Sequence, residues 1–94
     1  MTLELFARRS AVNVTAELFN DSHVLRVQCS DDPGTVECSF NDFIAALKSL
    51  RADIGTVTLK IGDHPSGDFL HRRVAGLAKF FAFPVVVDRA VERV

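Results

Sequence analysis

The residues best suited to chemistry lie in one short segment, Asp63-His64-Pro65-Ser66-Gly67-Asp68, followed by His71-Arg72-Arg73. Two of the three histidines of the chain are found here, seven positions apart. A metal site in this segment would use His64, Asp68 and His71, because imidazoles and carboxylates are common zinc ligands. Their spacing matches no standard zinc motif, however, and a third strong ligand is lacking. We therefore predict no metal ion and no cofactor.

A catalytic site in the same segment would make Ser66 a nucleophile, with His64 or His71 as its base. The G-x-S-x-G motif that places a nucleophilic serine on a strained turn is absent. Ser66 is also explained as the residue that caps the next helix. We assign no catalytic residue and expect a protein without enzymatic activity, and a small enzyme that uses this segment stays an alternative.

Ligand binding is the stronger functional interpretation of this segment. It follows a predicted strand and precedes a predicted helix, which is where open α/β sheets bind ligands. Backbone N–H groups near Gly67 would face an anion, with Arg72 and Arg73 nearby, although Asp63 and Asp68 would repel one. The candidate ligand-binding residues are His64, Ser66, Gly67, Asp68, His71 and Arg72.

Two amphipathic helices are predicted to position this segment. Ser39 is a suitable N-cap for a helix over residues 39–54, with apolar residues at helical spacing. A second helix is predicted over 67–82 and ends before Pro84. Gly76 in its middle indicates close packing of this helix on a sheet. The predicted core comprises Phe43, Ile44, Leu47, Leu50, Leu59, Ile61, Leu70, Val74, Leu77, Val85 and Val87.

The remaining pattern is typical of strands. Polar and apolar residues alternate over 12–18 and 24–29, and turn residues at 20–22 join these segments into a predicted β-hairpin. Short strands are expected over 35–38, 56–62 and 84–88, and a weak one at the N-terminus, from Thr2 to Ala7. The continuous apolar run of the last strand places it inside the sheet. Because Lys60 interrupts the apolar pattern of its strand, one face of the sheet is expected to be open.

The order β-β-(β)-α-β-α-β predicts an α/β (α+β) fold. We expect a two-layer sandwich, in which a mixed β-sheet with an N-terminal β-hairpin carries two helices on one face. Each helix should connect strands that lie parallel, by right-handed crossovers. With 94 residues, the chain forms a single globular domain, 1–94.

The open face of that sheet is the predicted interface. Its outward residues would be Asn13, Thr15, Glu17, Arg26, Gln28, Thr58 and Lys60. Arg26, Gln28, Thr58 and Lys60 are the candidate contact residues, and their mixed charge suits a specific polar interface. The partner would be another protein chain or a second copy, as a homodimer or larger homo-oligomer. A face that is merely solvated is the alternative.

Composition narrows the functional classes. The net charge of −1 argues against a dedicated nucleic-acid binder, which usually carries a basic excess. No apolar run approaches the roughly 20 residues that span a membrane, and no signal peptide is recognisable. Cys29 and Cys38 are predicted to be buried, reduced thiols in a cytoplasmic protein.

The sequence therefore predicts a small non-catalytic interaction or regulatory domain that binds another protein chain. A regulatory domain that binds a small ligand or an anion through residues 63–73 is the alternative from a different functional class. A flat surface at residues 63–73 would favour the interaction domain, whereas a closed pocket there would favour the ligand-binding domain or the small enzyme.

Overall fold

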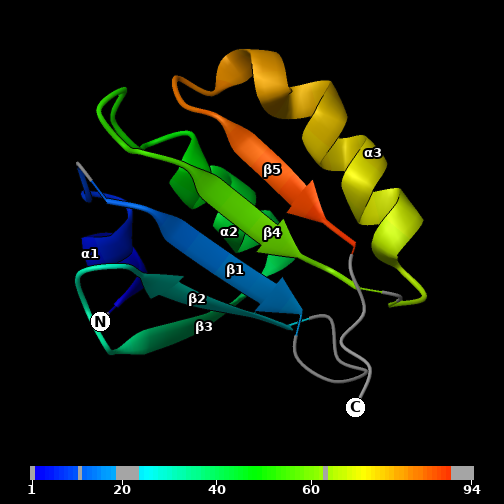
Figure 1. Ribbon diagram of the computed structural model, residues 1–94, viewed down its shortest axis with the longest axis horizontal. Helices are drawn as coiled ribbons and strands as arrows, with labels where there is room; N and C mark the ends of the chain where they lie inside the picture. Colours follow the sequence, from blue (N-terminus) through cyan, green and yellow to red (C-terminus); the bar gives the residue numbers. More distant parts are fainter. Residues whose placement is uncertain (1, 11, 19–23, 63, 90–94) are drawn as a thin grey trace.

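The computed structural model describes residues 2–10, 12–18, 24–62 and 64–89. It is a two-layer α+β sandwich built on one sheet of five strands in the order β3-β2-β1-β4-β5 (Figure 1). The strands are β1 Val14–Leu18, β2 Val24–Cys29, β3 Thr35–Ser39, β4 Val57–Lys60 and β5 Val85–Asp88. The helices are α1 Leu3–Phe6, α2 Phe40–Leu47 and α3 Gly67–Leu77, the last continued by a 3-10 turn, Ala78–Phe80. Within the described residues, no helix is both long and apolar enough to cross a membrane.

Strand β1 lies at the centre of the sheet and pairs in both senses. It runs antiparallel to β2, with Val14 opposite Cys29, which confirms the predicted hairpin. The turn predicted at residues 20–22 lies outside the described residues. On its other side β1 runs parallel to β4, and β4 runs parallel to β5. Helix α3 therefore connects two adjacent parallel strands, as predicted. Helix α2 connects β3 to β4, which are separated by β2 and β1.

The first element is a helix where a strand was predicted. Thr2 caps it, because its Oγ1 accepts a hydrogen bond of 3.2 Å from the backbone N–H of Leu5. The helix buries Phe6 against Phe43 of α2, with the two ring centroids 5.9 Å apart. A cap followed by a single buried aromatic residue outweighs the weak strand propensity of this segment.

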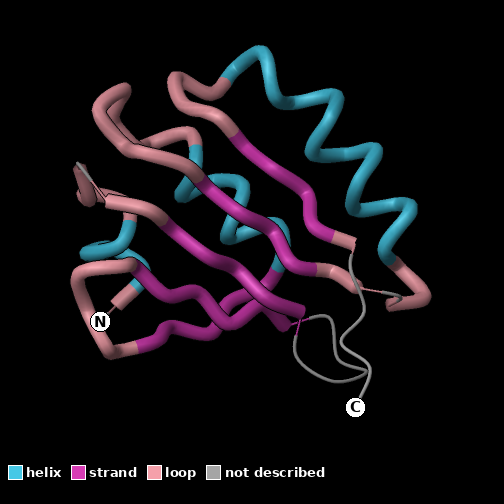
Figure 2. The backbone as a smooth tube through the Cα atoms, in the orientation of Figure 1, coloured by secondary structure: helices cyan, strands magenta, loops and turns pink. Residues whose placement is uncertain are grey.

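Helix α2 begins as predicted but ends earlier. The Oγ of Ser39 accepts a hydrogen bond of 3.1 Å from the N–H of Asp42, which confirms the predicted cap. The helix ends at Leu47, and the following segment is a series of turns (Figure 2). Leu50 and Ile54 are nevertheless buried in these turns. Their helical spacing therefore reflected their place in the core and not a continuing helix.

Strand β5 lies at the edge of the sheet, so its predicted internal position is wrong. It pairs with β4 alone, and Val86 remains 49% exposed. Its apolar run has a different cause. Val85 and Val87 pack partly against the core, while Val86 points to the opposite face of the strand.

The predicted role of Gly76 is also wrong. This residue is exposed, and a Cβ atom added to it would meet nothing within 4 Å. The glycine is therefore not required by close packing of α3 on the sheet.

The predicted core is largely confirmed. Eight of its eleven members are buried, and Leu77, Val85 and Val87 are partly buried and packed against them. The core lies between the sheet and the helices, of which α2 runs behind the sheet in the view of Figure 1. Further buried members, which were not predicted from the sequence, are Phe6, Leu25, Val57 and Phe83.

Both cysteines are buried and neither forms a disulfide, as predicted. Cys38 lies opposite Leu25, four residues along β2 from Cys29. At about 3.3 Å per residue this offset alone separates their Cα atoms by roughly 13 Å, whereas a disulfide requires Cα atoms within about 7 Å. Burial raises the pKa of Cys29, and burial together with the Asp42 charge raises the pKa of Cys38 to about 11.

We expect both thiols to resist alkylation in the folded protein. A buried thiol is inaccessible, and a raised pKa leaves little of the reactive thiolate at mildly alkaline pH. Iodoacetamide labelling followed by intact-mass measurement should give an unmodified native protein and two adducts per chain in denaturant. Rapid labelling of either cysteine under native conditions would contradict the buried positions.

Candidate functional site

The open face of the sheet carries two complete rows of side chains, one residue from each strand. We call the first the charged row. In sheet order it comprises Glu37, Arg26, Glu17, Lys60 and Asp88. We call the second the neutral row, and it comprises Thr35, Gln28, Thr15, Thr58 and Val86. The residues between these rows along each strand point to the core. This alternation fixes both rows on one face.

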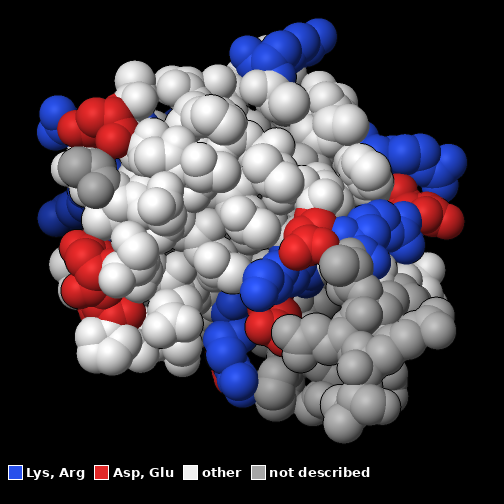
Figure 3. All heavy atoms as spheres, in the orientation of Figure 1, with Lys and Arg blue, Asp and Glu red and all other residues white. Residues whose placement is uncertain are grey.

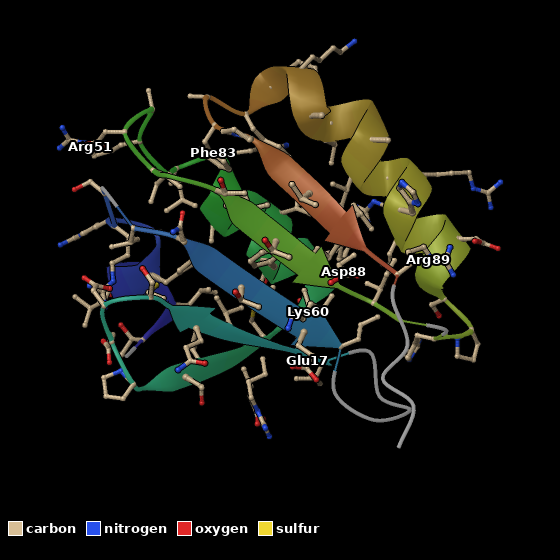
Figure 4. The ribbon with its side chains drawn as sticks, viewed as in Figure 1. Glu17, Arg51, Lys60, Phe83, Asp88 and Arg89 are labelled. Atoms are coloured by element: carbon tan, nitrogen blue, oxygen red, sulfur yellow. The ribbon has the colours of Figure 1, made fainter. Side chains whose placement is uncertain are left out.

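The charged row alternates in sign across all five strands. Each carboxylate has a cation on the adjacent strand, and each cation lies between two carboxylates. Between Arg26 and Glu37 the structure shows an ion pair with an N···O distance of 3.5 Å. Figure 4 shows Glu17, Lys60 and Asp88 at the carboxyl ends of three adjacent strands. Opposite charges on adjacent strands contribute about 0.2–1 kcal/mol per pair to the sheet.

The neutral row borders this band along its whole length. Three threonines and a glutamine present hydroxyl and amide groups, and Val86 adds an exposed apolar side chain. Figure 3 shows the charged residues along one part of the face and a broad area without charge beside them. The face therefore offers a polar, uncharged surface next to an ordered band of both signs.

All four contact residues predicted from the sequence lie on this face, on β2 and β4. Arg26 and Lys60 flank Glu17 in the charged row, and Gln28 and Thr58 flank Thr15 in the neutral row. The outer members of the charged row, Glu37 and Asp88, were not among the contact residues predicted from the sequence. Each alternates with inward residues of its own strand, and this alternation could have identified both as outward residues.

The six ligand-binding residues predicted from the sequence do not converge on one site. His64 takes part in its own turn, where its Nδ1 accepts a hydrogen bond of 3.0 Å from the N–H of Ser66. Gly67 is buried beside Ile61 and Arg89. Asp68, His71 and Arg72 line a shallow groove of about 350 Å³, to which Ser66 does not contribute. Asp63 lies outside the described residues.

Asp68 is held by Arg89. The guanidinium of Arg89 donates a hydrogen bond to the carboxylate of Asp68 and, at 3.4 Å, a second one to the carbonyl of Gly62. The bond from Arg89 and its positive charge hold the pKa of Asp68 below its usual value. Figure 4 shows Arg89 between the end of β5 and the start of α3. This contact ties the first turn of α3 to the sheet.

Ser66 lies instead in a groove between the first turns of α2 and α3. The groove has a volume of about 290 Å³ and is lined by Ser39, Phe40, Asn41, Ser66, Phe69, Leu70 and Arg73. The guanidinium of Arg73 donates a hydrogen bond of 2.8 Å to Asn41 and lies 5.1 Å from the ring centroid of Phe40. A cation held beside two aromatic rings and two hydroxyl groups could bind a small anion that has an apolar part. Of these lining residues, Ser66 was predicted from the sequence as a ligand contact, and Arg73 as a neighbour of the anion site.

Among the described residues, no three His, Cys, Asp or Glu side chains are close enough together to hold a metal ion. Comparisons with protein-family models, curated proteins and solved structures give no significant match.

Proposed function

We propose that this chain is a non-catalytic interaction domain that binds another protein chain through the open face of its sheet. The observation that carries the proposal is the charged row, which places five charges of alternating sign on one exposed face. Such a pattern specifies a partner by sign and position, because a shifted or wrong partner would bring like charges together.

The balance of the row favours a protein over a nucleic acid. Its three carboxylates and two cations lack the basic excess that a phosphate backbone requires. The adjacent neutral row supplies hydroxyl and amide groups that a protein surface can hydrogen-bond. The face is also broad. The molecule has extents of 32 × 29 × 21 Å, and the open face lies across the two longer ones (Figure 1).

Reduced, buried thiols are consistent with a cytoplasmic location, which we propose for this domain. Neither cysteine forms a disulfide, and oxidising compartments favour disulfides in small domains.

Site-specific photo-crosslinking tests the proposed interface. A photoreactive amino acid at Gln28 or Thr58 should give a protein adduct of defined mass in the cells that produce the chain. Ala45 and Ala52 are exposed away from the open face and serve as matched control positions. The Lys60→Glu substitution should reduce the yield of adduct at least about tenfold, because it creates a run of three adjacent carboxylates on β1, β4 and β5. Equal adducts from the control positions, or none from the open face, would contradict the proposal.

The groove between α2 and α3 supports a second candidate function, the binding of a small anionic ligand. The observation that favours it is Arg73, which lies at the groove beside Phe40 and Phe69. This candidate differs from the first in its site. Ligand binding there would be lost on Arg73→Gln and unaffected by Lys60→Glu.

A further inference from the structure

We propose that the partner of the open face is the same face of a second copy, related by a two-fold axis that runs parallel to the strands between β1 and β4. This inference rests on the proposed function and names its partner. It follows from the order of signs in the charged row, which reads minus, plus, minus, plus, minus from β3 to β5.

An alternating row is complementary to its own reversed copy under one condition. Rotation about an axis parallel to the strands reverses the order of the row and lays it over itself. When that axis passes midway between two strands, every charge that lies over the second copy meets one of opposite sign. When it passes through a strand, every charge meets one of the same sign. With the axis through β1, for example, Glu17 would face Glu17 of the second copy, and Arg26 would face its Lys60.

The axis between β1 and β4 creates four ion pairs. Glu17 faces Lys60 of the second copy, and Arg26 faces its Asp88. The symmetry repeats each pair once, as in any two-fold interface. In the neutral row, Thr15 then faces Thr58, and Gln28 faces Val86. The sheets would pack about 10 Å apart with strands aligned within about 30°, which is the usual aligned arrangement.

Val86 selects this axis over the one between β2 and β1. Both axes pair opposite charges, but the second leaves β5 outside the contact. Val86 is a large apolar side chain of the open face, and it is 49% exposed. Covering it adds apolar burial to the polar contacts. A stable interface of standard size buries roughly 800 Å² per partner, and the chain exposes 5724 Å² in all.

Sedimentation equilibrium on charge variants tests the axis. The wild-type chain should dimerise with a Kd below about 1 mM. Glu17→Lys and Lys60→Glu should each weaken dimerisation at least about tenfold, because each puts like charges together twice. An equimolar mixture of the two variants should form a heterodimer nearly as tight as the wild-type dimer, since both central pairs are then opposite in sign. Circular dichroism verifies that each variant is folded, and Thr58→Arg gives a second disruption at an outward position if either variant is not.

The outcomes separate this inference from the proposed function. A wild-type monomer at about 1 mM, or variants that leave the dimer unchanged, would overturn the self-pairing. Recovery in a mixture of Glu17→Lys with Arg26→Glu, and not with Lys60→Glu, would move the axis to β2 and β1 and overturn the register. If the chain is monomeric but Gln28 and Thr58 crosslink to a different protein, only this inference fails. If no adduct forms on this face, the proposed function fails with it.

Discussion

Truncation of Leu47 to alanine is expected to lower the free energy of unfolding by about 2–5 kcal/mol. Leu47 is the last residue of α2 and is 1% exposed, so the substitution removes buried methyl groups from the layer between helix and sheet. The surrounding core cannot close the cavity without moving the helix, and the cavity adds to the lost transfer free energy. Urea unfolding measured by circular dichroism gives the value directly.

The adjacent residue provides the control for this prediction. Lys48 is exposed and follows the helix, so Lys48→Ala should change stability by less than about 0.5 kcal/mol. A Leu47→Ala variant that loses less than about 1 kcal/mol would show that α2 does not pack on the sheet.

Substitution of Gly55 by alanine is expected to destabilise the protein by about 1–3 kcal/mol. A Cβ at this position would overlap the Oδ1 of Asn13 and lie 3.3 Å from the carbonyl oxygen of Val12. Asn13 cannot turn away freely, because its Oδ1 accepts a hydrogen bond of 3.0 Å from the N–H of Thr56. The substitution therefore either strains the chain before β4 or breaks this bond.

Gly76→Ala is the matched substitution with the opposite expected sign. The added Cβ enters open space inside α3, and alanine favours a helix by roughly 0.5–1 kcal/mol over glycine. Thermal unfolding of the two variants should thus show a lower melting temperature for Gly55→Ala and a higher one for Gly76→Ala. Equal shifts would contradict the environments that the structure gives these glycines.

Local patterns predicted the elements better than their ends or their neighbours. Ser39 marked the start of α2 because a cap depends on residues three positions apart. The end of α2 was missed because Leu50 and Ile54 keep helical spacing while lying in turns. The edge position of β5 was missed for another reason. Strand order depends on contacts between distant segments, and no local feature of Val85 to Asp88 encodes it.

The candidate site was likewise predicted in its local features but not in its long-range arrangement. Alternation along single strands identified Arg26, Gln28, Thr58 and Lys60 as outward residues. The rows that these residues form needed the register and the strand order, which join Glu37 at one edge to Asp88 at the other. The groove beside Arg73 could not be predicted, because it depends on how α2 and α3 approach each other. Residues 63–73 looked like one site because sequence proximity hides the fact that successive residues of a helix face different directions.

The alternating charges also act on the folding of a single chain, before any partner is met. Each strand contributes one charge, and in the native order every adjacent pair attracts. Placing β3 or β5 beside β1 with this row aligned would put a carboxylate next to Glu17. A slip of two residues between β1 and β2 keeps the buried face intact but moves Arg26 away from its carboxylate. Each lost pair is small, about 0.2–1 kcal/mol, yet a slip of two residues leaves the same side chains on the buried face. The charged row thus disfavours those mispaired sheets that bring like charges together or break a pair, although the hydrophobic pattern alone would accept them.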